Sequence, residues 1–76
     1  MNNGLNAGER IREMRKRYGV TQEFLADMLG VEHKAIQSWE QGAQQPTIKH
    51  MRALAKFFMC RVGDLYPGIR DKEEKT

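Results

Sequence analysis

Glycines end three successive helical patterns in the first part of this chain. Apolar residues recur there at spacings of three and four, which is the repeat of one face of an α-helix, and the patterns stop at Gly19, Gly30 and Gly42. Glycine commonly ends a helix because it adopts the left-handed backbone conformation of the helix C-terminus without steric cost. The sequence therefore predicts three short helices in a row rather than one long helix.

The first of these helices is expected to begin at Gly8. The second follows Thr21, whose hydroxyl can accept a hydrogen bond from a free amide of the first helical turn. A turn at Val31 and Glu32 leads to the third helix, which is expected over 33–41. The residues expected on the inner faces of the first two helices are Ile11, Met14, Arg15, Tyr18, Phe24, Leu25, Met28 and Leu29.

Two further helices are predicted in the second half of the chain. Thr47 can cap a fourth helix directly after Pro46, and Pro67 ends a short fifth helix over 62–66. The residues of the fourth helix that are expected to face inward are Ile48, Met51, Leu54, Ala55 and Phe58. The predicted fold class is all-α, with a flexible leader at 1–7, the domain at 8–67 and a charged, disordered tail at 68–76.

Composition limits the classes of protein and site. A chain of 76 residues forms one domain, because it buries only about 60% of its unfolded surface. The net charge of +3 permits an anionic partner, and one cysteine, Cys60, with two histidines cannot build a tetrahedral zinc site or a disulfide framework. The sequence contains no membrane-spanning apolar run and no signal-peptide pattern, so we expect a cytoplasmic protein without metal or cofactor. Basic side chains crowd one short segment: Arg10, Arg12, Arg15, Lys16 and Arg17.

The predicted third helix has two faces of opposite chemistry. Its apolar side carries Ala35, Ile36, Trp39 and Glu40, and its polar side carries His33, Lys34, Gln37, Ser38 and Gln41. All five polar side chains can donate a hydrogen bond. A helix of this kind, held by a short turn against another helix, can enter the DNA major groove, where each base pair presents its own pattern of donors and acceptors.

An isolated polar stripe is more often the solvated face of a surface helix. Here the residues around it favour a docked pair of helices, because Ala26 is small enough for close approach and Gly30 supplies the turn. The apolar contacts that would lock the pair come from Leu25, Leu29, Val31, Ile36 and Trp39. Trp39 is accordingly expected in the core rather than as an exposed stacking residue.

The segment TQEFLADMLGVEHKAIQSWEQG resembles the helix-turn-helix of the Cro and C1 repressors, also called the xenobiotic response element family. The likeness extends to IREMRKRYGVTQ, the family's first helix, and to PTIKHMRALAKFFMCRVGDLY, its fourth and fifth helices, so it covers 9–66. It implies a compact five-helix lambda-repressor-like domain with the helix-turn-helix over 22–41. It also implies a sequence-specific transcriptional regulator, expected to be a repressor, that binds double-stranded DNA.

The resemblance also implies roles for individual residues. It aligns His33, Lys34, Gln37 and Ser38 with the family's base-reading positions, and Gln22, Gln41 and the backbone amides of Gly42 and Ala43 with its phosphate-binding positions. For His33 a DNA contact and a plain surface position both remain open. Two departures lower the expected attraction for phosphates: Glu32 stands where the family usually has Ser or Thr, and Gln44 and Gln45 stand where it often has Lys or Arg.

One ion pair is predicted from the residues alone. Arg15 falls on the apolar face of the first helix and Glu40 on the apolar face of the third. Because a charge on an apolar face needs a partner, each is the best candidate for the other. The resemblance agrees, since the family often joins these helices by such a pair.

Apolar residues near the end of the fourth helix exceed what one small core can use. Phe57, Met59, Val62 and Tyr66 are therefore predicted to form a twofold homodimer contact, which would suit a palindromic operator. His50 is expected to face solvent and Cys60 to pack as a small hydrophobe. No pattern of a nucleophile with a base, a phosphate-binding glycine loop or a small-molecule site is evident, so no enzyme is expected.

The principal alternative is a protein-interaction module, for example an antitoxin-like or partner-binding regulator, in which DNA binding is secondary. The neutral Gln44 and Gln45 and the acidic Glu32 favour it mildly. Binding of RNA is a weaker alternative, because the sequence shows no exposed aromatic pair to stack on bases.

Overall fold

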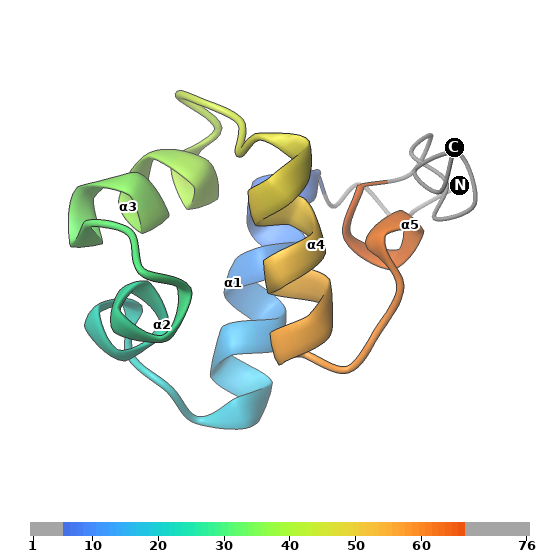
Figure 1. The fold of residues 1–76 in the computed structure, drawn as a ribbon, viewed down its shortest axis with the longest axis horizontal. Helices are drawn as coiled ribbons and strands as arrows, with labels where there is room; N and C mark the ends of the chain where they lie inside the picture. Colours follow the sequence, from blue (N-terminus) through green and yellow to red (C-terminus); the bar gives the residue numbers. More distant parts are fainter. Residues whose placement is uncertain (1–5, 67–76) are drawn as a thin grey trace.

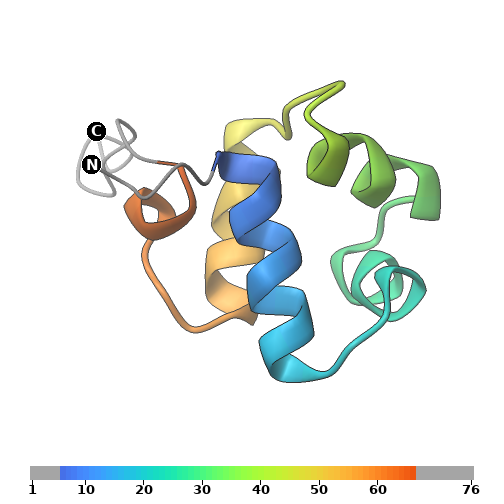
Figure 2. The ribbon, with the colours of Figure 1, turned by 180° about the vertical axis from the view of Figure 1, so that it is seen from behind.

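The computed structural model describes residues 6–66, which form five α-helices and no strand. In chain order these are α1 (Ala7–Tyr18), α2 (Gln22–Leu29), α3 (His33–Gln41), α4 (Ile48–Phe57) and α5 (Val62–Leu65). The pair α2 and α3 lies on one side of α1 and α4, and α5 lies on the opposite side (Figure 1, and Figure 2 from behind). The all-α, five-helix class expected from the sequence is confirmed.

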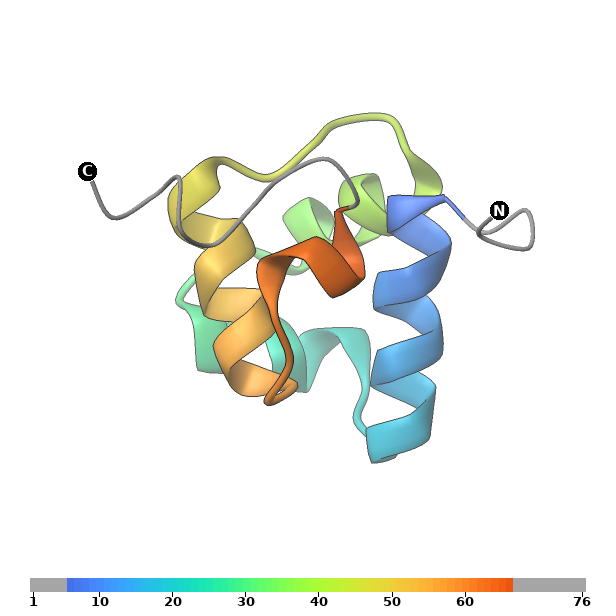
Figure 3. The same ribbon diagram turned by 90° about the vertical axis from the view of Figure 1, so that its right-hand side faces the viewer.

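The core lies where the helices converge. Its fully buried side chains are Ile11, Leu25, Ile36, Leu54, Phe58 and Leu65, so every helix contributes and the short α4–α5 connection adds Phe58. α3 packs against both α1 and α2, while α5 contacts α4 and α1 and lies between them in Figure 3. Trp39 is buried in this core, as its spacing predicts.

Close packing of α1 on α3 depends on Gly8. A Cβ atom at this position would lie 2.5 Å from the backbone oxygens of Trp39 and Glu40, well inside van der Waals contact. The absence of a side chain therefore lets the first turn of α1 approach the last turn of α3.

The helix ends follow the predicted capping residues in most places. Thr21 accepts a hydrogen bond from the Phe24 amide at 3.0 Å, and Thr47 accepts one from the His50 amide at 3.3 Å. Gly30 and Gly42 end α2 and α3 with φ of 72° and 81°, a conformation that a side chain would disfavour. These three glycine-terminated helices, including α1 with Gly19, confirm the predicted pattern.

The start of α1 differs from the prediction. Asn6 and Glu9 form a reciprocal capping box, with the Glu9 amide donating to Asn6 Oδ1 at 2.8 Å and the Asn6 amide donating to Glu9 Oε1 at 3.1 Å. Asn6 and Ala7 therefore belong to the folded domain and not to a flexible leader. The rest of the predicted leader and tail lies outside the described residues.

Four residues expected to face inward are exposed, among them Tyr18 at the end of α1, which keeps 43% of its surface exposed. Phe24 and Met28 of α2 keep 47% and 56% of their surface exposed, and Ile48 at the start of α4 keeps 42%. On α2 only Leu25 and Ala26 are buried and Leu29 packs partly against the core, so the covered side of this helix is narrower than the predicted stripe. The helical spacing of apolar residues therefore predicts more buried residues than the structure contains.

Candidate nucleic-acid interface

The α2–turn–α3 unit is stabilised by buried side chains of both helices and by a backbone hydrogen bond in the turn. Leu25 and Ala26 of α2 are buried, as are Ile36 and Trp39 of α3. In the turn, the Val31 amide donates to the Ala26 carbonyl at 3.0 Å. The two helices therefore meet at a fixed angle, and the outer side of α3 is presented on a rigid support.

The outer side of α3 is polar and accessible. Lys34, Gln37 and Gln41 are exposed, while Ser38 is half-buried. The opposite side is the buried one, with Ile36 fully buried. The predicted division of α3 into an inner apolar face and an outer polar face is therefore present.

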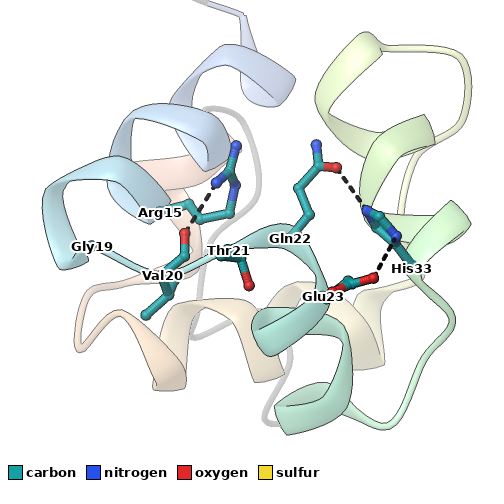
Figure 4. A pocket seen from close by; sticks show the side chains of 7 residues that line it. All are labelled: Arg15, Gly19, Val20, Thr21, Gln22, Glu23 and His33. Atoms are coloured by element: carbon teal, nitrogen blue, oxygen red, sulfur yellow. Dashed lines mark hydrogen bonds and ion pairs between the residues drawn. The ribbon is translucent and has the colours of Figure 1, made fainter.

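Arg15 and Glu40 form the predicted ion pair. Arg15 Nε donates to Glu40 Oε2 at 2.6 Å, and Nη2 donates to Oε1 at 3.2 Å. Arg15 Nη1 also donates to the Val20 carbonyl at 3.0 Å, as Figure 4 shows. Because a guanidinium has five N–H groups, two of them remain for another acceptor.

Gln22 and His33 extend this pair into a chain of hydrogen bonds. Gln22 Nε2 donates to Glu40 Oε1 at 3.0 Å, and Gln22 Oε1 lies 2.9 Å from His33 Nε2. His33 Nδ1 lies 3.8 Å from Glu23 Oε2 on the other side of the ring (Figure 4). Both nitrogens of His33 thus contact side chains of α2, and the DNA contact that the sequence left open for His33 stays a prediction.

These side chains surround an open hollow of about 440 Å³ at the amino end of α2 (Figure 4). Its lining residues are Arg15, Gly19, Val20, Thr21, Gln22, Glu23 and His33. The first amides of an α-helix have no acceptor within the helix and point out of its amino end, where the helix dipole adds partial positive charge. The Phe24 amide donates to Thr21, and Gln22 and Glu23, the two residues before it in the first turn, both line the hollow.

The amides of Gly42 and Ala43 after α3 are hydrogen-bonded within the chain. The Gly42 amide donates to the Trp39 carbonyl at 3.2 Å and the Ala43 amide to the Ser38 carbonyl at 2.9 Å. Both hydrogen bonds close the C-terminus of α3, so these two amides are already in use. Their contact with phosphates stays a prediction, and the Gln41 side chain is exposed.

Glu32 precedes α3 without capping it through its side chain. Its carboxylate is exposed near the amino end of α3, which matches the departure noted from the sequence. Gln44 and Gln45 are exposed as well.

The predicted dimer patch is wrong in two of its four members. Val62 and Tyr66 belong to the core, with only 3% and 5% of their surface exposed, and so they offer no surface to a partner. They are buried because α5 folds back onto α4 and α1. Phe57 is half-buried against the rings of Tyr18, Phe24 and Phe58, and Met59 remains the strongly exposed member.

Two buried polar groups and one histidine were not expected from the sequence. The Tyr66 hydroxyl and Arg10 Nε are buried without a hydrogen-bond partner, and burial raises the pKa of the Tyr66 phenol. His50, expected to face solvent, is half-buried with its ring 5.4 Å from that of Trp39.

Residues 6–66 contain no group of three or more potential ligands that could hold a metal ion. No helix in the same range is long and apolar enough to cross a membrane.

Comparison with known proteins gives consistent matches over most of the chain. A family model described as helix-turn-helix matches residues 11–65. The chain is 39% identical over 69 residues to the HTH-type transcriptional regulator DicA of Escherichia coli K12, which covers 91% of this chain and 51% of DicA. It is also 42% identical over 65 residues to an HTH-type transcriptional regulator of Archaeoglobus fulgidus, covering 86% of this chain and 90% of that protein.

A solved structure supports the same assignment. The P22 c2 repressor in complex with a synthetic operator superposes with a TM-score of 0.80 at 35% identity, covering 86% of this chain and 98% of that chain. The chain spans about half the length of DicA, so its likeness to that regulator concerns one part of it. The five helices, the buried α2–α3 contact and these matches show that the chain belongs to the helix-turn-helix family, of the Cro/C1 type.

Proposed function

We propose that this chain binds double-stranded DNA in a sequence-specific way and regulates transcription as a repressor, with α3 in the major groove. The observation that carries the proposal is the exposed polar side of α3, with Lys34 and Gln37 outward and Ile36 buried behind them. An α-helix fits the major groove, and these side chains can reach base edges there. The likeness to an operator-bound repressor supports this use of the fold.

The hollow at the amino end of α2 is the proposed phosphate site. Free amides at the start of α2 and the two remaining N–H groups of Arg15 can donate to phosphate oxygens. Gln22 takes part by holding the hollow in shape, because its amide is bonded to Glu40 and His33. Lys34, Gln37 and Ser38 are proposed to read bases, and Gln41 to contact the backbone.

Two copies are proposed to bind one palindromic operator, with their α3 helices roughly 34 Å apart, one turn of DNA. A single domain contacts few base pairs, and a twofold pair doubles the site that is read. Met59 is the exposed residue left from the predicted contact. The stoichiometry on a selected operator, measured by sedimentation, tests this part of the proposal, and one copy per palindrome would contradict it.

The proposed action is binding and not catalysis, and the proposed compartment is the cytoplasm.

Binding to a random-sequence duplex across a salt series, followed by selection of a preferred site, tests DNA recognition. We expect the logarithm of the affinity to fall with the logarithm of salt concentration with a slope of several, and a palindrome to be enriched. No measurable binding at low salt would contradict the proposal.

A protein-interaction module is the second candidate function. It is favoured by the exposed apolar side chains of Phe24 and Met28 on α2, outside the polar side of α3. This candidate would be favoured if the chain did not bind DNA and if the Met28→Lys variant no longer bound a protein partner that the wild type binds.

A further inference from the structure

We propose that DNA binding by this chain takes up one proton, on His33, and is therefore tighter at lower pH. The inference rests on the proposed function, because it assumes that phosphates enter the hollow at the amino end of α2. It concerns the chain of groups from Arg15 through Glu40 and Gln22 to His33 and Glu23 (Figure 4).

The hydrogen-bond chain determines which nitrogen of His33 carries the hydrogen. The carboxylate of Glu40 can only accept, so the Gln22 amide must turn its NH₂ group toward Glu40. The carbonyl oxygen of Gln22 then faces His33 at 2.9 Å, and it can only accept. His33 Nε2 must therefore donate, and neutral His33 carries its single ring hydrogen on Nε2.

The second nitrogen of the ring faces a carboxylate. In neutral His33, Nδ1 presents a lone pair toward Glu23 Oε2 at 3.8 Å, so the carboxylate receives no hydrogen from the ring. A proton on Nδ1 converts this contact into an ion pair between a donor and an acceptor. Protonation needs no rearrangement of Gln22, because the Nε2 hydrogen bond is the same in both states.

Charge in the hollow depends on this proton. Arg15 is neutralised by Glu40, and Glu23 is unpaired when His33 is neutral, so these groups together carry one net negative charge. With His33 protonated they carry none. The flanking groups on α3, Glu32 and Lys34, are of opposite sign and leave this balance unchanged.

A DNA phosphate that enters the hollow favours the protonated state. Its negative charge opposes the charge of Glu23 and attracts a protonated imidazole, so the bound state holds more protons than the free state. By linkage the affinity then rises as the pH falls, with at most one proton taken up per site. We expect tighter binding at pH 6 than at pH 8, by less than tenfold per pH unit, which is the limit for uptake of one proton.

The test measures the affinity for a random-sequence duplex at low and constant ionic strength between pH 6 and pH 8, because phosphate contacts do not depend on sequence. His33→Gln keeps a donor for Gln22 but cannot titrate, so we expect its affinity to be independent of pH over this range. Glu23→Gln removes the carboxylate, so we expect tighter binding at pH 8 and a smaller pH dependence. His50→Gln is the matched control, because His50 lies on α4 beside Trp39 and Thr47, outside the hollow, and it should behave as the wild type.

A second measurement does not depend on the variants. The ring resonances of His33 in the wild-type protein, followed by NMR at pH 7, should move toward the protonated form when duplex is added. Equal pH dependence in the wild type and His33→Gln would overturn the proton linkage and leave DNA binding standing. Loss of the pH dependence in His50→Gln would also overturn it, whereas absence of binding at every pH would overturn the proposed function as well.

Discussion

Arg15 and Glu40 lie 25 residues apart in the chain, yet the Arg15 Nε atom is 2.6 Å from Glu40 Oε2. The side chain of Glu40 keeps only 4% of its surface exposed, so its charge is paired in a largely dry site. The pair joins α1 to α3, and Gln22 of α2 donates to the same carboxylate. The orientation of α3 therefore depends on polar contacts from two other helices as well as on the core.

Arg15→Ala should lower the free energy of unfolding by about 2 kcal/mol, because it leaves the buried Glu40 carboxylate with only Gln22 as a donor. Arg12→Ala is the control, since Arg12 is an exposed residue of the same helix, and it should change stability by less than about 0.5 kcal/mol. Urea denaturation gives both values. Equal midpoints for the two variants would contradict the structural role of the pair.

Gly8→Ala should destabilise the domain, although alanine is the better helix former by about 1 kcal/mol. The added Cβ would lie 2.5 Å from two backbone oxygens of α3, and backbone cannot move aside as a flexible side chain can. We expect a loss of about 2 kcal/mol or more, as for other overpacked sites. Thermal melting followed by circular dichroism measures it, and an increase in Tm would show that α1 and α3 are further apart.

Tyr18→Phe and Tyr66→Phe each remove a phenol hydroxyl, which has a hydrogen-bond partner in Tyr18 and none in Tyr66. The Tyr18 hydroxyl donates to the Phe58 carbonyl at 2.7 Å, so its loss should cost about 1 kcal/mol. The Tyr66 hydroxyl is buried without a partner, so its loss should leave stability unchanged or raise it by up to about 1 kcal/mol. A larger loss for Tyr66→Phe than for Tyr18→Phe in denaturant titrations would reverse this assignment.

Tyr66 should also make the domain sensitive to alkali. Burial raises the pKa of its phenol above the ordinary value of 10.0, so above that pH the phenol ionises in the unfolded chain before it does so in the folded one. The free energy of unfolding has its full value below pH 10. It decreases as the pH rises further, because the unfolded state then holds fewer protons than the folded state. The difference in Tm between wild type and Tyr66→Phe should therefore change in favour of the variant between pH 9 and pH 11, a range that brackets the ordinary phenol pKa of about 10. A constant difference would contradict burial of the phenol.

Lys34→Ala and Ser38→Ala should relax the preferred DNA sequence, because a base contact discriminates by about 1 to 3 kcal/mol. Gln22→Ala should instead weaken binding to all sequences alike, since it disturbs the hollow proposed for phosphates. Selection of sites by each variant, with affinities for one common duplex, separates the two effects. If all three variants lost affinity with an unchanged preference, the polar side of α3 would not be the base-reading surface.

Local features of the fold could be predicted from sequence because they depend on neighbouring residues. The caps Thr21 and Thr47 and the glycines after α1, α2 and α3 act within one turn of helix, and the structure confirms them. The Arg15–Glu40 pair could also be predicted, since two opposite charges on apolar faces have few other ways to be neutralised. Two capping interactions among these local signals were missed: the capping box of Asn6 with Glu9 at the start of α1, and the Asp64 carboxylate that accepts a hydrogen bond from the Arg61 amide at 3.0 Å at the start of α5.

The sequence could not predict which surface of each helix is exposed. Phe24, Met28 and Ile48 are as apolar as their buried neighbours, yet the packed helices leave about half of the surface of each side chain uncovered. Val62 and Tyr66 are buried because α5 returns to α1 and α4, a contact that no local pattern encodes. The same holds for Gly8, whose importance comes from two oxygens more than 30 residues away.

The sequence thus determined the number of helices, most of their ends and the chemistry of the two faces of α3, because these follow from backbone geometry and from the spacing of residues along one helix. Tertiary packing alone decided which apolar residues are covered and which donors remain free. It turned His33 toward α2 and used the amides of Gly42 and Ala43 to close α3. A side chain's partners are set by the elements packed around it, and these come from distant parts of the chain.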